Sequence, residues 1–300
     1  MDKWFENKFE KNELREYTRK QLKPNYFESV ARKFSVTNWL ILINTLVFIL
    51  VMVLLPFFGE EKMMGLLALQ ANAFFSGSLW TVFTSMFMHG NFAHLLFNMI
   101  SLFFIGNFVE RIIGRKKFFW FYLISGILAG FFYVLLSYFF GISELGARIF
   151  VSPDTFAVGA SGAIFALLGL LAVLTPKNRV YLIMGPLIAI IFQALIGQLF
   201  PSSRFLPLLD LLITVYFVVS VFAIFSFSSS FRKLALPLEM PFWVLPIIAI
   251  VPLVIIGLFV DLPIGNTAHL GGLLVGLVYA SYLKEKYPNK TRHLSVMFSK

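Results

Sequence analysis

The chain has 300 residues, of which 59% are hydrophobic and 13% are charged, and its mean hydropathy is +0.83. Soluble domains are about half apolar and about one quarter charged, so this composition excludes a soluble globular protein and predicts a membrane protein. The absence of cysteine excludes disulfides and thiol chemistry. The net charge of +10 comes without a nucleic-acid-binding motif, so we expect no nucleic-acid partner.

Long uncharged runs follow one another along the chain. A helix needs about 20 apolar residues to cross the hydrocarbon core of a bilayer. We therefore expect an all-α fold, a polytopic transmembrane helical bundle with eight spans. The eight predicted segments are 34–59, 63–109 (a loop followed by one helix), 118–143, 155–176, 180–203, 211–231, 240–260 and 262–283.

Charged residues divide the chain into three parts. Residues 1–33 are dense in charge, lack the apolar core of a signal peptide, and are suited to an amphipathic helix at the membrane surface. We expect them to form a cytoplasmic N-terminal segment. Residues 34–283 form the predicted transmembrane domain, and residues 284–300 form a predicted cytoplasmic C-terminal tail.

The basic residues predict the orientation in the membrane. Lys and Arg gather on the cytoplasmic side of membrane proteins. If all eight segments cross the bilayer, every Lys and Arg except Lys62, Arg148 and Arg204 falls on one side. We therefore expect a multi-pass protein of the plasma (inner) membrane with both termini in the cytoplasm.

Two histidines and an asparagine stand out near the second predicted span. His94 and Asn98 are four residues apart and share a helix face, and His89 lies a turn or more earlier. Polar side chains inside a span are costly, so they require a functional hypothesis. No carboxylate or third clustered histidine joins the two histidines, so we predict no metal site. Hydrogen bonding between helices is the alternative to a catalytic role.

Small residues mark the fourth and eighth predicted spans. Gly159 and Gly162 flank Ser161 in the fourth span, and His269 precedes Gly272 and Gly276 in the eighth. A pair of small residues four apart usually permits close helix packing in membranes. If these two spans pack through their small residues, Ser161 and His269 meet.

The depth of the two side chains supports this pairing. A helix rises 1.5 Å per residue. Counted from Thr155 and Leu262, Ser161 and His269 lie about 9 Å and about 10 Å below the outer surface. The polar residues of the second span fall in the same outer half, so all three sets are expected at one level, where a cavity open to the outside supplies water.

These residues have the chemistry of a serine hydrolase that uses a dyad. The Ser161 hydroxyl is a weak nucleophile until a base such as His269 takes its proton. A tetrahedral intermediate needs hydrogen-bond donors for its oxyanion, and His89, Asn98 and the Ser161 N–H are candidates. His94 is a further polar group near the site or a structural brace. This chemistry needs no cofactor.

The three motifs together resemble the rhomboid family of intramembrane serine proteases. The family shows a Gly-x-Ser-Gly motif, an Ala-His motif followed by a small-xxx-small face, and a His-x4-His-x3-Asn pattern. Here these motifs are residues 159–162, 268–276 and 89–98, and Glu110-Arg111 with Gly114 also resembles the family. The resemblance covers about residues 80–282 and implies a rhomboid-like six-helix core, with two extra spans in this chain.

The resemblance also implies roles. It makes Ser161 the nucleophile and His269 the general base, with His89 and Asn98 in the oxyanion hole and His94 as a polar partner nearby. Gly159 and Gly162 are expected to permit close backbone geometry. The expected substrates are single-pass or polytopic membrane proteins, cut at or near the outer end of a transmembrane segment.

Two residues depart from the family pattern. Thr81 follows Trp80 where the family often has Arg, and Phe165 takes a position often held by Tyr. Phe165 can still stack under the His269 ring, although it offers no hydroxyl.

Three other functions stay open from the sequence. A catalytically inactive rhomboid-like protein that binds membrane proteins is the main alternative, and a transporter or channel and a purely structural membrane protein are the others. The oligomeric state and the physiological substrate are left open.

Overall fold

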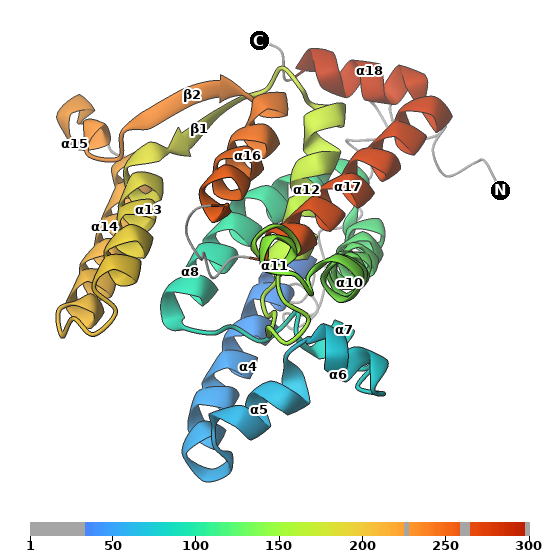
Figure 1. Cartoon of the computed structure of the whole chain (residues 1–300). Coiled ribbons are helices and arrows are strands. Elements are labelled where there is room, and N and C mark those ends of the chain that lie inside the picture. Colours follow the sequence, from blue (N-terminus) through green and yellow to red (C-terminus); the bar gives the residue numbers. More distant parts are fainter. Residues whose placement is uncertain (1–33, 225–227, 259–264, 298–300) are drawn as a thin grey trace, which may run out of the picture.

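The structure is a computed structural model that describes residues 34–224, 228–258 and 265–297. The predicted N-terminal segment, residues 1–33, lies outside the described residues. The fold is mostly helical (Figure 1). In chain order, the elements are α4 (Val36–Phe58), α5 (Glu60–Leu67), α6 (Ala71–Phe75), α7 (Thr81–Thr84), α8 (Phe92–Ser101), the π-helix η1 (Leu102–Gly106), α9 (Asn107–Ile113), α10 (Arg115–Phe140), α11 (Glu144–Phe150), α12 (Ser161–Leu174), β1 (Arg179–Ile183), α13 (Met184–Leu199), α14 (Leu206–Ile224), α15 (Ser229–Lys233), β2 (Pro237–Pro241), the 3₁₀-helix η2 (Phe242–Val244), α16 (Leu245–Gly257), α17 (Asn266–Lys286) and α18 (Pro288–Met297).

The chain is a multi-pass membrane protein. Within the described residues, four helices are long and apolar enough to cross a bilayer: α4, the continuous helix Phe92–Ile113, α10 and α14. Ser161–Leu174, Met184–Leu199 and Phe242–Gly257 are apolar but shorter. Helix α17 has 21 residues but ends in charged side chains. The number of eight spans therefore stays a prediction.

The expectation of an all-α fold is wrong at one place. Strand β1 pairs antiparallel with β2, so that Tyr181 lies opposite Glu239. Val180, Tyr181 and Ile183 have the β-branched or aromatic side chains that favour a strand. The predicted fifth span, residues 180–203, consequently begins as a strand, and its helix α13 has 16 residues.

Helix α12 begins at Ser161, later than the predicted segment that starts at residue 155. Ala157 forms a β-bridge with Leu69, and Gly159 has a φ of 121°, which no helix contains. The depth counted along a helix from Thr155 is therefore wrong, because extended residues rise about 3.3 Å each. Residues 259–264, which precede α17, lie outside the described residues.

Helix α12 forms the centre of the core and packs on α10 and α17. A Cβ atom added at Gly272 would collide with the carbonyl oxygen of Gly162, and one at Gly276 would collide with that of Ala166. The backbones of α12 and α17 approach so closely because these positions carry no larger side chain. The start of α17 is thereby held against the start of α12.

Helices α13 and α14 stand beside the main bundle and pack mainly on each other (Figure 1). The ribbon formed by β1 and β2 connects this pair to α12 and α16. In α14, the Phe217 ring contacts the Phe97 ring of α8, with centroids 4.0 Å apart. We call α13 and α14 the helix pair below.

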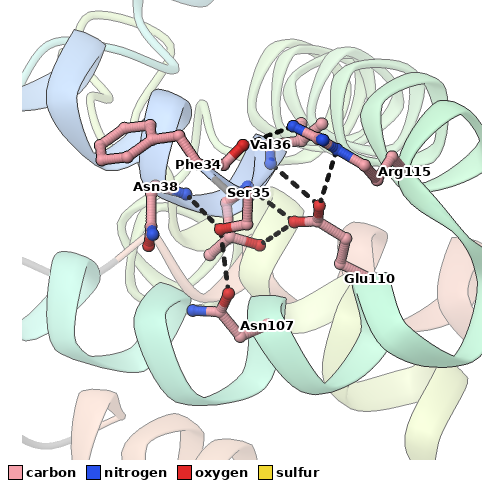
Figure 2. Close-up of polar contacts among 8 residues, drawn as sticks. Phe34, Ser35, Val36, Asn38, Asn107, Glu110 and Arg115 are labelled. Carbon is pink, nitrogen blue, oxygen red and sulfur yellow. Dashed lines mark hydrogen bonds and ion pairs between the residues drawn. The ribbon is translucent and has the colours of Figure 1, made fainter. Parts of the chain in front are cut away.

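A buried carboxylate joins α9 to the start of α4 (Figure 2). Glu110 is 6% exposed and accepts hydrogen bonds from the N–H groups of Val36 and Thr37 at 2.9 and 2.8 Å, and from the Thr37 hydroxyl at 2.8 Å. The first N–H groups of a helix have no acceptor within the helix, so Glu110 supplies one. Arg115 Nε lies 3.6 Å from the same carboxylate.

Candidate active site

Ser161 and His269 lie side by side at the starts of two packed helices. The Ser161 Oγ and His269 Nε2 atoms are 2.8 Å apart, which is hydrogen-bond distance. Ser161 is the first residue of α12, and His269 lies in the first turn of α17. The close packing of Gly272 on Gly162 brings these two first turns together. The arrangement lets the imidazole accept the hydroxyl proton.

The His269 ring is held by an aromatic side chain. Phe165 stacks on it with centroids 4.3 Å apart and an angle of 12° between the planes. Phe165 follows Ser161 by four residues, so the two side chains share one face of α12. The buried His269 Nδ1 has no hydrogen-bond partner within the described residues. The Phe165 stack and the Ser161 hydroxyl are therefore the contacts that orient this ring.

Gly159 lies between Ser161 and the polar residues of α8. A Cβ atom added at Gly159 would lie 2.7 Å from His94 Nε2 and 3.4 Å from Asn98 Nδ2, so a larger residue cannot fit beside them. The positive φ of Gly159 is also unfavourable for other residues. His94 and Asn98 thus lie against the backbone that leads into Ser161.

His89 is the most deeply buried of these groups, at 1% exposure. Its ring lies edge-on to that of His94, with centroids 5.1 Å apart. Within the described residues, neither of its ring nitrogens has a hydrogen-bond partner. No group of three His, Asp or Glu side chains that could hold a metal occurs in the described part of the chain.

Two groups are candidate donors to an anion at this site, one on Ser161 itself and one beside Gly159. The backbone N–H of Ser161 opens a helix, so no carbonyl of that helix can accept from it. The buried Asn98 Nδ2 has no partner within the described residues. A helix N-terminus also carries a partial positive charge, which favours an anion. The site can therefore take up negative charge next to a serine–histidine pair.

Backbone contacts that the sequence analysis missed hold the loop before Ser161. The Gly159 N–H donates to the Ser85 carbonyl at 2.8 Å, and Leu69 and Ala157 exchange two backbone hydrogen bonds of 2.9 and 2.7 Å. The Tyr133 hydroxyl donates to the Thr155 carbonyl at 2.7 Å. Pairing between backbone groups leaves no pattern of side chains in the sequence. The contacts of Gly159 with Ser85 and of Leu69 with Ala157 therefore could not be predicted from it.

Known proteins share the part of the chain that builds this site. The sequence matches the Rhomboid domain family over residues 76–205 and 213–286, more than half of the chain. It is 33% identical over 128 residues to RHOMBOID-like protein 12, mitochondrial, of Arabidopsis thaliana, covering 42% of this chain and 38% of that protein.

Two bacterial proteins are similar over shorter stretches. Rhomboid protease AarA of Providencia stuartii is 38% identical over 95 residues, which cover 31% of this chain and 33% of that protein. Rhomboid protease GluP of Bacillus subtilis strain 168 is 35% identical over 103 residues, which cover 34% of this chain and 17% of that protein. The aligned residues make up less than half the length of each of these three relatives.

Proposed function

This chain belongs to the rhomboid family, and we propose that it is an intramembrane serine endopeptidase with Ser161 as nucleophile and His269 as general base. The observation that carries the proposal is the 2.8 Å separation of Ser161 Oγ and His269 Nε2. The names of the relatives AarA and GluP, both rhomboid proteases, support it.

In the proposed first step, Ser161 Oγ attacks the scissile carbonyl carbon while His269 Nε2 takes the hydroxyl proton. The carbonyl oxygen, which becomes negative, accepts hydrogen bonds from the Ser161 N–H and Asn98 Nδ2, with His89 as a further donor. His269 then gives its proton to the leaving amine, and an acyl-enzyme ester on Ser161 forms as the peptide bond breaks. Water then attacks this ester while His269 takes a proton from it. His269 returns that proton to Ser161 Oγ as the ester bond breaks and the carboxylic acid product leaves.

The proposed substrates are membrane proteins cut near the outer end of a transmembrane segment. A helix hides its carbonyl groups in its own hydrogen bonds, so the substrate must unwind before the scissile carbonyl can reach Ser161. Both helix starts that carry Ser161 and His269 lie at the end that the basic residues predict to be outside. We propose a plasma-membrane protein with both termini in the cytoplasm.

The test compares cleavage of a model transmembrane substrate by purified variants in liposomes. We expect Ser161→Ala and His269→Ala to lower the cleavage rate by about 10⁴-fold or more. Ser281→Ala and His293→Ala are matched controls, because both side chains are exposed and lie on α17 and α18. These controls are expected to retain the rate.

A fluorophosphonate probe separates a protease from an inactive relative that only binds membrane proteins. We expect the probe to label Ser161 in the unchanged chain and not in Ser161→Ala. Full cleavage by both dyad variants, or no labelling of the folded unchanged chain, would overturn the proposal.

A further inference from the structure

The helix pair presents a long apolar surface on its outer sides. In α13, the exposed residues Ile188, Phe192, Leu195 and Leu199 follow one another at spacings of four and three, so they form one stripe. Exposed apolar residues continue on α14: Leu208, Leu211, Leu212, Val215 and Phe222. In a membrane such stripes face lipid or another transmembrane helix.

A polar pair interrupts this apolar surface. Gln193 Nε2 of α13 donates to Asp210 Oδ1 of α14 at 3.1 Å, and this hydrogen bond is exposed. A carboxylate in or near the bilayer is costly and marks a functional site by default. Asp210 is the fifth residue of α14, so it lies close to the end where α13 turns into α14.

Helix α14, which carries Asp210, contacts helix α8 of the candidate active site through an aromatic ring pair. Phe217 of α14 packs on Phe97, the neighbour of Asn98 in α8. Asp210 precedes Phe217 by about two turns of α14, or about 10 Å along the axis. In Figure 1, α14 begins at the end of the structure that holds α5 and α6, and Asp210 lies in the first two turns of α14.

Charge at this end of the molecule is complementary to a basic partner. The predicted outer end of the described residues carries five acidic side chains, Glu60, Glu61, Glu144, Asp154 and Asp210, against three basic ones, Lys62, Arg148 and Arg204. Residues 206–212, including Asp210, lie outside the two segments that match the family. Asp210 therefore lies in a part of the chain that the family match does not cover.

We propose that the helix pair is a docking surface for the transmembrane helix of the substrate, and that Asp210 selects helices with a Lys or Arg at their outer boundary. The apolar stripes contact the substrate helix, and the Asp210 carboxylate pairs with its basic side chain while Gln193 holds the carboxylate in place. This inference rests on the proposed function. It adds a selection step that precedes unwinding and cleavage.

The first test measures selection. Two substrates differ at a single residue of the outer boundary, Lys in one and Leu in the other, and the ratio of their kcat/KM values is determined in liposomes. We expect the unchanged chain to prefer the Lys substrate by about 1.4- to fivefold. Asp210→Asn should bring this ratio to about one. Asp210→Lys should instead prefer a third substrate, with Glu at the same position, over the Lys substrate. Glu144→Gln removes another exposed acid and is the matched control.

The second test does not depend on cleavage. The chain has no cysteine, so a single cysteine at Phe192 or Leu211 can be crosslinked by a bismaleimide to one cysteine in the substrate helix. The Ser161→Ala background keeps the substrate intact. Leu46→Cys on α4, a residue 55% exposed, is the control for random encounters in the bilayer.

The outcomes separate docking from catalysis. Crosslinks to substrate at Phe192 or Leu211 but not at Leu46, together with loss of the preference in Asp210→Asn, support the docking surface. Equal crosslinking at all three positions, crosslinks to a second copy of this chain instead, or an unchanged preference in Asp210→Asn would overturn it. Because crosslinking needs no active nucleophile, this result stands whether or not Ser161 proves to be catalytic.

Discussion

The Phe165 ring lies parallel to the His269 imidazole, one turn of α12 below the serine that the imidazole contacts. Stacked rings contribute about 0.5–1.5 kcal/mol beyond their buried area. We expect Phe165→Ala to let the imidazole rotate away from Ser161 and to lower kcat by about two- to tenfold. Phe165→Tyr keeps the ring and should retain the rate. Equal kcat values for Phe165→Ala and the unchanged chain would show that the stack does not orient the base.

Asn98→Ala removes the amide donor that lies beside Gly159. Loss of one oxyanion donor lowers kcat by about 10²- to 10³-fold in a well-studied serine protease. We expect a similar decrease here with little change in KM, because the donor acts on charge that develops in the transition state. Steady-state kinetics on a fluorogenic transmembrane substrate measures both constants. A lower unfolding temperature with unchanged kcat would instead assign Asn98 a structural role.

Gly272→Ala places a methyl group where the Gly162 carbonyl oxygen lies. Overpacking of a core costs about 1–3 kcal/mol, and here it also pushes His269 away from Ser161. We therefore expect both a lower thermal unfolding temperature in detergent and a lower cleavage rate. Gly65→Ala is the matched control, because a Cβ atom at Gly65 in α5 meets nothing within 4 Å. Equal unfolding temperatures for the two variants would refute the close packing of α12 on α17.

Glu110→Ala leaves the first N–H groups of α4 and the Thr37 hydroxyl without their acceptor. An unsatisfied buried polar group costs about 1–3 kcal/mol, so we expect destabilisation by at least that amount in a denaturant titration. Glu110→Gln retains one acceptor oxygen, so its stability should lie between that of the unchanged chain and that of Glu110→Ala. Glu144→Gln breaks an exposed ion pair with Arg148 and is expected to cost about 0.3–0.5 kcal/mol. A larger effect at Glu144 than at Glu110 would contradict this account.

The membership of the rhomboid family was predicted from motifs and is confirmed by the family match. Side-chain type and short spacing carried that prediction. His94 and Asn98 share a helix face whatever the helix packs against, and the small residues Gly272 and Gly276 mark a close approach without naming the partner helix. These features are local, so they can be recognised along a single chain.

Hydrophobicity was less informative about where helices begin. An apolar run predicts burial in protein or lipid, but it does not distinguish a helix from an extended segment. Strand β1 and the extended residues before Ser161 both lie in such runs. The strand at Arg179–Ile183 exists because it pairs with residues 54 to 62 positions further along the chain, and no window of local sequence contains that partner. The expected all-α fold and the depth count from Thr155 failed for this reason.

The sequence by itself determined that this chain belongs in a membrane and which side chains are chemically able to act, because composition and residue type do not depend on folding. The tertiary structure alone decided that an hydroxyl from one helix and an imidazole from another, 108 residues apart in the chain, lie 2.8 Å apart. That distance depends on the backbones of α12 and α17 meeting where neither has a bulky side chain, and contact between two distant surfaces is a property of the packed molecule.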